Sequence, residues 1–588
     1  MLRSPSIRYL FWAFYLTIIA LQSVLAWQNE LFVDEAFYWL EGRFLQFSYT
    51  EVPGFVPWLN ALSGHFLPTN SFYFRLPYLL AAWSIPWLAF HLATLLSPER
   101  DKAYLAAIFS LCLPLLGLVG VLAIADVWIL FFSVSAVIFL LRLLISQQPF
   151  DALVLGLVLA LGVNVHIRFW FVLFIAFMAA IMVWRSQITR LKWLWQLTFP
   201  LLIVGFLPII WFNFQHDFPL LSFQLGERNP WQFQISHLWF FVTQILLTTP
   251  LIFWLCLSTL KAPQDNDLKQ QKALQFIQYI GIMYWLLYAL LGFYSDNLRT
   301  NAHWPLLSYL LLLLIAAIQG RTDTPLKKWA IITGFGAHVS FLLGFYVLIH
   351  SLPVQSNSHK ELISHSIGWQ QLSAHVDTIQ QPKQLLLADQ FMTAAALNYY
   401  QVKQSDVYVK SLTHPLNQKH GRQQQLKLMG LLEESTVPEN TLLVVEHTAL
   451  KLTQQISFYQ ATCRQLNGLN LMSDLSIRQG TKLYYFFHSG SGDCQMPPIV
   501  YHQYEQKVHS GWILAPISRH QNIRAEALDG LTKTPLNLIK KPLGTDPLFR
   551  ELAATDYALY EYQIESEKSI QLKISNTNYS VLTRRYWP

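Results

Sequence analysis

Charged residues are scarce in this chain: Asp, Glu, Lys and Arg together make up 13% of its 588 residues. Hydrophobic residues make up 53% and aromatic residues 15%, and the mean hydropathy is +0.32. A soluble globular domain has too little interior to bury so many apolar side chains. The composition therefore excludes an ordinary soluble protein and indicates a large membrane-embedded part.

Cofactor and metal motifs are also missing. The sequence contains no Walker phosphate-binding loop and no glycine-rich dinucleotide fingerprint. Its four cysteines do not have zinc-type spacing. Cys112 and Cys256 lie in apolar runs, and a disulfide between Cys463 and Cys494 requires that this part of the chain lie outside the cytosol. The formal charge of +7 is not concentrated in a basic stripe, so nucleic acid is not an expected partner.

The apolar residues are concentrated in residues 1–350, where eleven runs are candidates for transmembrane helices of about 20 residues each. The first run follows two arginines and lacks a small-residue cleavage site, so we expect an uncleaved helix. The predicted helices lie at residues 9–27, 77–97, 103–122, 126–145, 150–164, 168–184, 196–213, 237–260, 274–294, 304–319 and 329–350.

Basic residues set the predicted orientation of these helices. Fourteen of the 19 Lys and Arg residues in 1–350 fall at helix ends assigned to the cytoplasm. This bias exists only if 150–164 and 168–184 are two helices, because a single long helix would invert every later loop. The outer face then carries most of the polar side chains capable of chemistry: Asp34, Glu35, Asp126, His166, Arg168, Asn213, His216, Asp217, Arg299 and His303.

The remaining residues have an ordinary polar composition and are predicted to form two further domains. Residues 351–495 alternate helical patterns with short β-rich runs, which predicts an α/β domain. Residues 496–588 contain several strand-like segments separated by turn residues, which predicts a small β-sandwich. We therefore expect a polytopic α-helical membrane domain at 1–350 followed by these two periplasmic domains.

Three acids are candidate catalytic residues. Asp34 and Glu35 follow the first predicted helix, where a carboxylate can act as a general base on an acceptor hydroxyl. The alternative is a helix start, since acids are favoured in a first helical turn. Asp126 stands between two apolar runs as either a functional acid or a helix N-cap. No metal or other cofactor is assigned, although a divalent cation bridging Asp34 and Asp126 to a phosphate is an alternative use of the two carboxylates.

Cationic and polar residues on the same face are candidate ligands for a substrate. Arg168, Arg299 and His303 can bind a donor phosphate, because guanidinium groups match phosphate oxygens in bidentate geometry. Each can also be a residue at a helix end whose charge reaches the membrane surface. The other candidate substrate-binding residues are His166, Asn213, His216 and Asp217.

Five segments resemble a known family in order and spacing: Val33–Trp39, Arg75–Pro77, Ala125–Asp126, Trp211–Asp217 and His303–Pro305. They are similar to the bacterial protein O-mannosyltransferase-like glycosyltransferases of the GT-C fold (family 39). This group includes aminoarabinose and galacturonic acid transferases that act on lipid A and core lipopolysaccharide. The resemblance covers about residues 5–400, including Gly368-Trp369, and does not extend to the segment after about residue 498.

The resemblance implies a polyprenyl-phosphate-sugar donor, inversion at the anomeric carbon and an acceptor at the outer face of the bacterial inner membrane. Asp34 matches the family's catalytic acid, Glu35 is its motif partner and Asp126 matches a second acid. Two positions depart from the family pattern. Ile167-Arg-Phe169 stands where many relatives have Ser-Lys-Tyr, and Asn301-Ala-His-Trp304 replaces an Asn or His directly before Trp.

We therefore predict a multi-pass inner-membrane glycosyltransferase, a hexosyl or pentosyl transferase acting on lipid A or core lipopolysaccharide. A protein O-glycosyltransferase or a transferase for another envelope glycan is the alternative acceptor assignment. A flippase for lipid-linked sugars is the alternative from another class, but it would place charges at the membrane midplane, and no inverted repeat is visible. In a third hypothesis, an envelope scaffold, the soluble domains would be primary and Asp34 replaceable.

Overall fold

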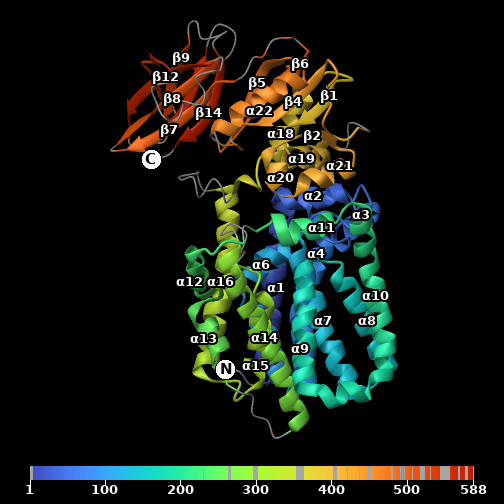
Figure 1. Ribbon diagram of the computed structural model, residues 1–588. Helices are drawn as coiled ribbons and strands as arrows, with labels where there is room; N and C mark the ends of the chain where they lie inside the picture. Colours follow the sequence, from blue (N-terminus) through green and yellow to red (C-terminus); the bar gives the residue numbers. More distant parts are fainter. Residues whose placement is uncertain are drawn as a thin grey trace. The chain divides into compact units, whose positions relative to one another are not determined.

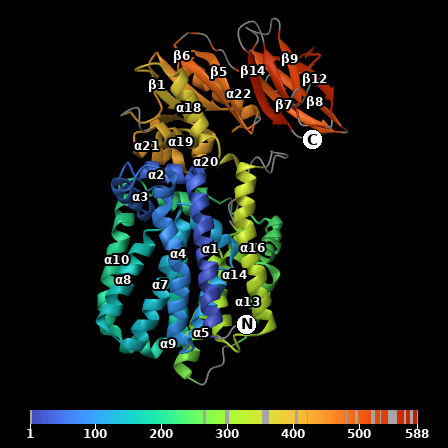
Figure 2. The same cartoon turned by 180° about the vertical axis from the view of Figure 1, so that it is seen from behind.

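The chain forms two compact units, which we describe separately (Figures 1 and 2). The membrane unit comprises Met1–Asn29 and Glu41–His350, and the C-terminal unit comprises Glu30–Leu40 and Ser351–Pro588. The computed structural model describes residues 4–229, 231–261, 267–295, 302–351, 363–401, 407–419, 421–435, 437–447, 449–450, 452–478, 481–490, 492, 494, 497–505, 507–516, 523–529, 532–542, 557–566, 568, 570–575 and 580–586.

The membrane unit is helical, and each of the eleven predicted runs coincides with a helix or a bent pair of helices. Its α-helices are α1 (Ser4–Gln28), α3 (Phe55–Phe66), α4 (Ser71–Leu96), α5 (Arg100–Ser110), α6 (Pro114–Val121), α7 (Ala125–Ser146), α8 (Pro149–Val163), α9 (Ile167–Arg190), α10 (Lys192–Gln215), α11 (Pro219–Ser222), α12 (Leu238–Thr248), α13 (Pro250–Ser258), α14 (Leu268–Leu291), α15 (Leu306–Ile318) and α16 (Pro325–His350). Short π- and 3₁₀-helical turns occur at η1 (Phe223–Glu227), η2 (Ile235–His237) and η3 (Gly292–Tyr294).

Seven helices among the described residues are long and apolar enough to span a membrane, or up to nine if each bent pair is one span. The bent pairs are α5 with α6, at 68°, and α12 (from Ile235) with α13, at 102°. The other two predicted runs are the shorter apolar helices α8 and α15, of 15 and 13 residues. Every residue of α15 is buried, so this helix lies inside the bundle. The chain is therefore a multi-pass membrane protein.

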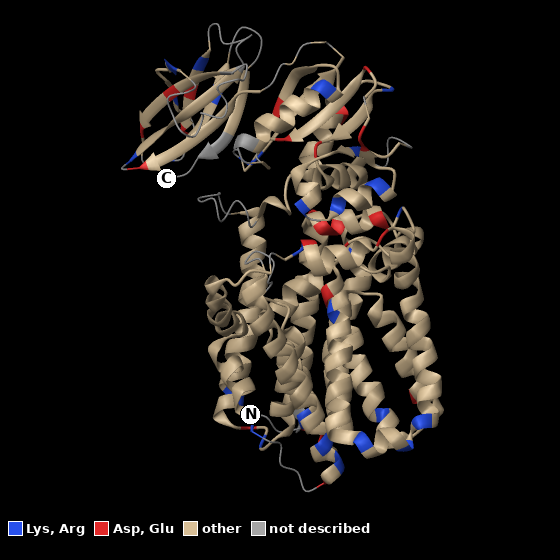
Figure 3. Cartoon of the chain, in the orientation of Figure 1, with Lys and Arg blue, Asp and Glu red and all other residues tan. Residues whose placement is uncertain are grey.

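Figure 3 shows Lys and Arg gathered at one end of the helices of the membrane unit, as the topology predicted. Fewer charged residues lie along the helices themselves. Asp126 lies in the first turn of α7, and an acid at the start of an apolar helix has either a structural partner or a chemical task.

The C-terminal unit contains a six-stranded sheet with the strand order β3-β2-β1-β4-β6-β5. Strands β1 to β4 are parallel, whereas β6 runs antiparallel to both β4 and β5. The elements of this part are α2 (Val33–Glu41), α18 (Trp369–Ile379), β1 (Leu385–Ala388), α19 (Phe391–Gln401), β2 (Lys410–Leu412), α20 (Pro415–Lys419), α21 (Arg422–Leu428), β3 (Leu432–Glu433), β4 (Thr441–Glu446), α22 (Leu452–Gln465), β5 (Leu469–Ile477) and β6 (Lys482–Ser489). The predicted α/β architecture is confirmed.

Two four-stranded antiparallel sheets complete the unit, in the orders β10-β9-β13-β14 and β11-β12-β8-β7. Their strands are β7 (Ile499–Glu505), β8 (Val508–Pro516), β9 (Arg524–Asp529), β10 (Thr532–Pro535), β11 (Ile539–Lys541), β12 (Tyr557–Glu565), β13 (Ile570–Ser575) and β14 (Ser580–Tyr586). One hydrophobic cluster contains residues of these sheets, such as Leu572, together with residues of the α/β part, such as Tyr485. The division near residue 495 stays a prediction.

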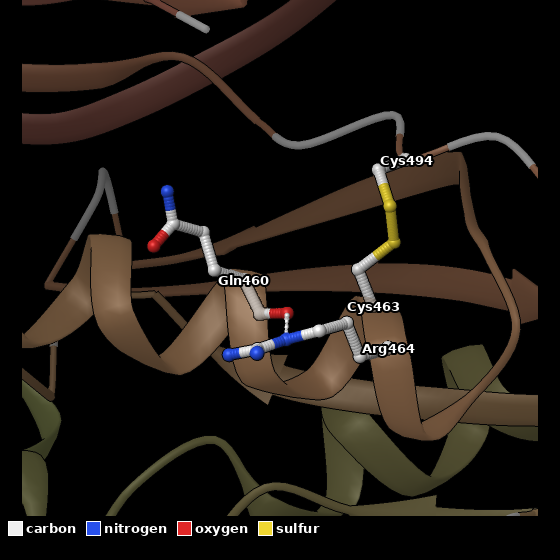
Figure 4. Close-up of a disulfide and its surroundings, with 4 residues drawn as sticks. All are labelled: Gln460, Cys463, Arg464 and Cys494. Atoms are coloured by element: carbon white, nitrogen blue, oxygen red, sulfur yellow. Dashed lines mark hydrogen bonds between the residues drawn. A yellow bond between two sulfur atoms is a disulfide. The ribbon is translucent and has the colours of Figure 1, made fainter. Parts of the chain in front are cut away.

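A disulfide joins Cys463 on α22 to Cys494 in the segment after β6 (Figure 4). Cys112 and Cys256 are buried and free. The cysteine pair considered in the sequence is therefore formed within the C-terminal unit.

Candidate functional site

Asp34 and Glu35 lie in the first turn of α2, and the two carboxylates have different environments. Glu35 is fully buried, and its Oε2 accepts a hydrogen bond of 2.7 Å from the backbone N–H of Phe32. This contact satisfies an N–H group at the start of the helix and places negative charge there, as a capping acid does. The geometry thus gives Glu35 a structural task that the sequence analysis had named as the alternative.

The side chain of Asp34 is 39% exposed and forms an ion pair with Arg422, with 3.3 Å between Oδ1 and Nη2. Arg422 opens α21 and is itself buried, with 2% of its side chain exposed. Its guanidinium carbon lies 4.2 Å from the ring centre of Phe37, 5.3 Å from that of Tyr38 and 5.4 Å from that of Phe391. Arg422 belongs to none of the sequence motifs described above.

Four hydrogen bonds join residues 30–33, at the start of α2, to the rest of the C-terminal unit. The carboxylate of Glu30 accepts from the backbone N–H groups of Trp369, at 2.7 Å, and Gln370, at 3.3 Å, and so caps α18. The backbone N–H of Leu31 donates to the Tyr400 hydroxyl at 2.9 Å, and that of Val33 donates to the His365 carbonyl at 3.1 Å. Burial raises the pKa of Glu30, although the hydrogen bonds from the backbone N–H groups of Trp369 and Gln370 and the charge of Lys482 oppose the rise.

Gly368 explains part of the Gly-Trp motif at the start of α18. It precedes the helix in the left-handed region, with φ of +84°. A Cβ atom there would also lie 2.7 Å from the side chain of Ile477. Glycine meets both demands, and the turn that it makes presents the Trp369 N–H to Glu30.

Asp126, Arg168 and His303, three of the candidate residues, form a cluster in the membrane unit, which we call the Asp126 cluster. Asp126 Oδ1 lies 2.7 Å from Arg168 Nη1 and 2.9 Å from His303 Nε2. Exposed fractions of these side chains are only 12%, 10% and 22%. Asp126 is in the first turn of α7 and Arg168 in the first turn of α9, so two helix starts converge on the carboxylate.

His166 serves as the N-cap of α9. Its Nδ1 accepts a 3.1 Å hydrogen bond from the backbone N–H of Arg168, which requires an unprotonated Nδ1. The ring therefore helps to fix the first turn of α9, from which the Arg168 side chain projects.

Trp304 brings a second arginine to this cluster. The guanidinium carbon of Arg168 lies 5.1 Å from the Trp304 ring centre, and that of Arg228 lies 5.7 Å from it. Arg228 also donates a 3.1 Å hydrogen bond to Gln224. Both arginines line a cavity of about 90 Å³, together with His166, Ile167, Phe171, Gln224, Leu225, Asn229, Trp231, Tyr288, Leu291, Gly292, Ser295 and Trp304.

The cavity combines two guanidinium groups with the phenol of Tyr288, whose hydroxyl donates to that of Tyr284 at 3.1 Å. One water molecule needs only about 10–15 Å³ by this measure of volume, so the space admits a group larger than water. Two cations aimed at such a space favour an anionic occupant. The charge count leaves five of the 19 Lys and Arg residues of 1–350 on the predicted outer face, and Arg228 is one of these five, which is the signal that the sequence offers for it.

The Trp211–Asp217 motif forms the end of α10 and the turn after it. Asn213 is buried; it donates to the Ile209 carbonyl and accepts from the N–H of Leu221. The His216 ring packs against Phe212, and Asp217 is exposed at a positive φ of 61°. None of the contacts described for these three residues joins them to the Asp126 cluster, so their substrate role stays a prediction.

Two further expectations lack support in the described part of the molecule. Arg299, the third predicted phosphate ligand, lies outside the described residues. Among the residues that are described, no group of three or more His, Cys, Asp and Glu side chains could hold a metal ion. Asp34 and Asp126 also belong to different units.

The chain has the GT-C fold, as the motif resemblance predicted. This fold is shared with the crystal structure of ArnT from Cupriavidus metallidurans in the apo state, with a TM-score of 0.58 at 11% identity, over 82% of this chain and 98% of that one. ArnT from the same organism bound to undecaprenyl phosphate gives a TM-score of 0.55 at 10% identity, over 84% and 100% of the two chains. No protein-family model and no curated protein sequence matches the chain.

Proposed function

We propose that the protein is an inverting glycosyltransferase that uses a polyprenyl-phosphate-linked sugar as donor. The observation that carries this proposal is the cavity beside Trp304, where Arg168 and Arg228 converge next to Asp126 and His303. Guanidinium groups bind phosphate oxygens in paired hydrogen bonds, and a partly buried site strengthens each of them. The shared fold with an ArnT that binds undecaprenyl phosphate supports the same donor class.

In this proposal the donor phosphate is bound by Arg168 and Arg228, with His303 as a further donor of hydrogen bonds. Asp126 is not a ligand of the phosphate, since two anions would repel; it holds Arg168 and His303 in place. As the bond between the anomeric carbon and the phosphate oxygen breaks, negative charge grows on the leaving polyprenyl phosphate. The two arginines stabilise that charge.

Asp34 is proposed to be the general base. It takes the proton of the acceptor hydroxyl while the hydroxyl oxygen attacks the anomeric carbon from the side opposite the phosphate, which inverts the configuration. Where the acceptor is an ionised phosphate, no proton needs to be removed and the reaction does not require Asp34 as a base. Lipid A or core lipopolysaccharide is the proposed acceptor class, and a protein hydroxyl or another envelope glycan is the alternative.

We further propose that the protein lies in the bacterial inner membrane, with the Asp126 cluster and the C-terminal unit, which contains Asp34, on the periplasmic side. The Cys463–Cys494 disulfide supports this orientation, because disulfides persist in the oxidising periplasm and not in the cytosol. The basic residues gathered at one end of the helices of the membrane unit agree with a cytoplasmic location of that end.

The test of catalysis is Asp34→Asn in the full-length protein, assayed with a polyprenyl-phosphate-linked sugar and lipid A. Loss of a general base lowers transfer by about 10²–10⁴-fold, and donor affinity should stay unchanged. The matched control is Asp323→Asn, which alters an exposed Asp paired with Arg321 and should leave transfer intact. Wild-type turnover by Asp34→Asn would contradict the assignment.

The sugar and acceptor are identified by mass spectrometry of lipid A and core lipopolysaccharide from cells with and without the gene. A mass difference equal to one sugar residue is the expected result. Unchanged lipids together with a changed glycoprotein profile would move the acceptor to protein. Labelling of cysteines introduced beside Asp34 and His303 from both sides of the membrane would indicate a transporter instead.

A further inference from the structure

Arg422 contacts the helix that carries Asp34, although 388 residues separate the two in the sequence. It is the first residue of α21 and follows Gly421, which has a left-handed backbone with φ of +67°. Its guanidinium lies beside Phe37 of α2 and Phe391 of α19, whose rings meet edge to face at 5.4 Å. The aromatic rings hold the guanidinium plane by cation–π contact.

The same guanidinium reaches Asp34. Asp34, Phe37 and Tyr38 recur at helical spacing on one face of α2, so a single arginine covers the rings and pairs with the carboxylate at 3.3 Å. Arg422 has 2% of its side chain exposed, whereas Asp34 has 39%. The cation is therefore fixed in the protein and the acid faces outward from it.

From this arrangement we infer that Arg422 is a positioning residue for Asp34, which makes the α/β part of the chain a component of the catalytic centre. The inference rests on the proposed function, in which Asp34 is the base. A fixed opposite charge favours the ionised carboxylate, which is the form that accepts a proton. It also restricts the carboxylate to the orientations in which Oδ1 stays beside Nη2, and transfer depends steeply on such orientation. Arg422 is too buried to touch the substrate.

Arginine suits this position better than lysine. Its planar group stacks on aromatic faces while an edge N–H donates to the carboxylate, whereas an ammonium group is compact and more strongly hydrated. We therefore expect Arg422→Lys to retain part of the positioning of Asp34, because the positive charge remains, and Arg422→Gln to retain little of it.

The test compares Arg422→Gln and Arg422→Lys with wild type and with Arg464→Gln, a change to an exposed arginine on α22 that donates to the Gln460 carbonyl (Figure 4). We expect Arg422→Gln to lower kcat by about 10–100-fold while KM for the donor changes less than threefold, because it leaves the arginines of the membrane unit intact. Arg422→Lys should be intermediate, and Arg464→Gln should match wild type.

A pH–rate profile separates positioning from mere stabilisation of the fold. The charged groups near Asp34 among the described residues include Arg422 from α21 and Glu35 on the same helix, whose Oε2 accepts a hydrogen bond from the backbone N–H of Phe32. Without the cation, the acidic limb of the profile should move to higher pH for Arg422→Gln and less for Arg422→Lys. Thermal unfolding of each variant is measured alongside.

Three outcomes decide the matter. A lower kcat with a displaced acidic limb supports the inference. Reduced thermal stability with an unchanged profile, or an unchanged kcat, overturns it while leaving the proposed function standing, provided that Asp34→Asn has lost transfer. If Asp34→Asn turns over like wild type, the proposed function fails, and the inference fails with it.

Discussion

Replacing Asp126 with Asn should expose how strongly the cluster in the membrane unit depends on its central acid. The substitution preserves shape but removes the negative charge that Arg168 and His303 share. Removing one partner of a buried ion pair costs about 3–5 kcal/mol of unfolding free energy, because the remaining charge is left uncompensated. The side chains here keep 10–22% exposure and Asn can still accept one hydrogen bond, so we expect the lower end, about 3 kcal/mol.

A second substitution tests the cause. Arg168→Met removes the cation that Asp126→Asn leaves without its anionic partner. The double variant should therefore be at most about 1 kcal/mol less stable than Arg168→Met alone. The resulting coupling energy is about 2 kcal/mol or more. Reversible denaturation of the full-length protein in mixed micelles measures all four states of the cycle.

The control is the exposed pair of Arg321 and Asp323, whose side chains are 82% and 51% exposed. Asp323→Asn should change the unfolding free energy by less than about 0.5 kcal/mol, as expected for a surface pair. If the costs of Asp126→Asn and Arg168→Met simply add, the two residues are not an energetic unit. The account of Asp126 as the residue that holds the phosphate-binding cations would then be refuted.

Two further predictions concern the C-terminal unit. Burial, together with the nearby charge of Glu446, raises the pKa of Asp389 from 3.8 to about 7, so its contribution to stability is present below about pH 4 and lost as the pH rises through 7. This loss of unfolding free energy is at most on the order of 4 kcal/mol. Asp389→Asn should remove it when the unfolding free energy is measured from pH 4 to 8. The same pH dependence in the variant and the wild type would exclude Asp389 as its source. Replacing Cys463 and Cys494 by Ser opens a loop with a sequence separation of 31 and should cost about 3–4 kcal/mol. Chemical denaturation measures that loss, and equal stability of the variant and the oxidised wild type would show that the disulfide contributes nothing.

The helical bundle and several strands were predictable because their signals are local. Among the described residues, apolar runs marked each helix or bent pair of helices that is long and apolar enough to span a membrane, and short β-rich runs marked β1, β4 and β6. Basic residues placed Asp126, Arg168 and His303 on one face, and the structure brings all three together. The lengths of α8 and α15 were less predictable, since a short helix inside a bundle has the same composition as a spanning one.

The arginines beyond this group could not be identified from spacing. Arg422 pairs with Asp34 although 388 residues separate them in the sequence. Arg228 joins the site through its contact with the Trp304 ring, and no sequence pattern predicts that contact. Spacing alone also does not show which backbone groups a motif residue contacts. Arg75 of the Arg-Leu-Pro motif is buried and donates to the carbonyls of Ala26 and Asn29, which ends α1.

The segment Glu30–Leu40 has a consequence for how the protein is made. Its partners are 339 residues away at Trp369, 369 at Tyr400 and 388 at Arg422. At about 5–20 residues per second, a ribosome needs roughly 20–80 s to add the last of these after Asp34 has been synthesised. Throughout that interval the helix that carries Asp34 lacks the contacts that orient it. If Asp34 is the base that we propose, a chain still under synthesis does not hold this base in its final position until Arg422 has been added and the C-terminal unit has folded.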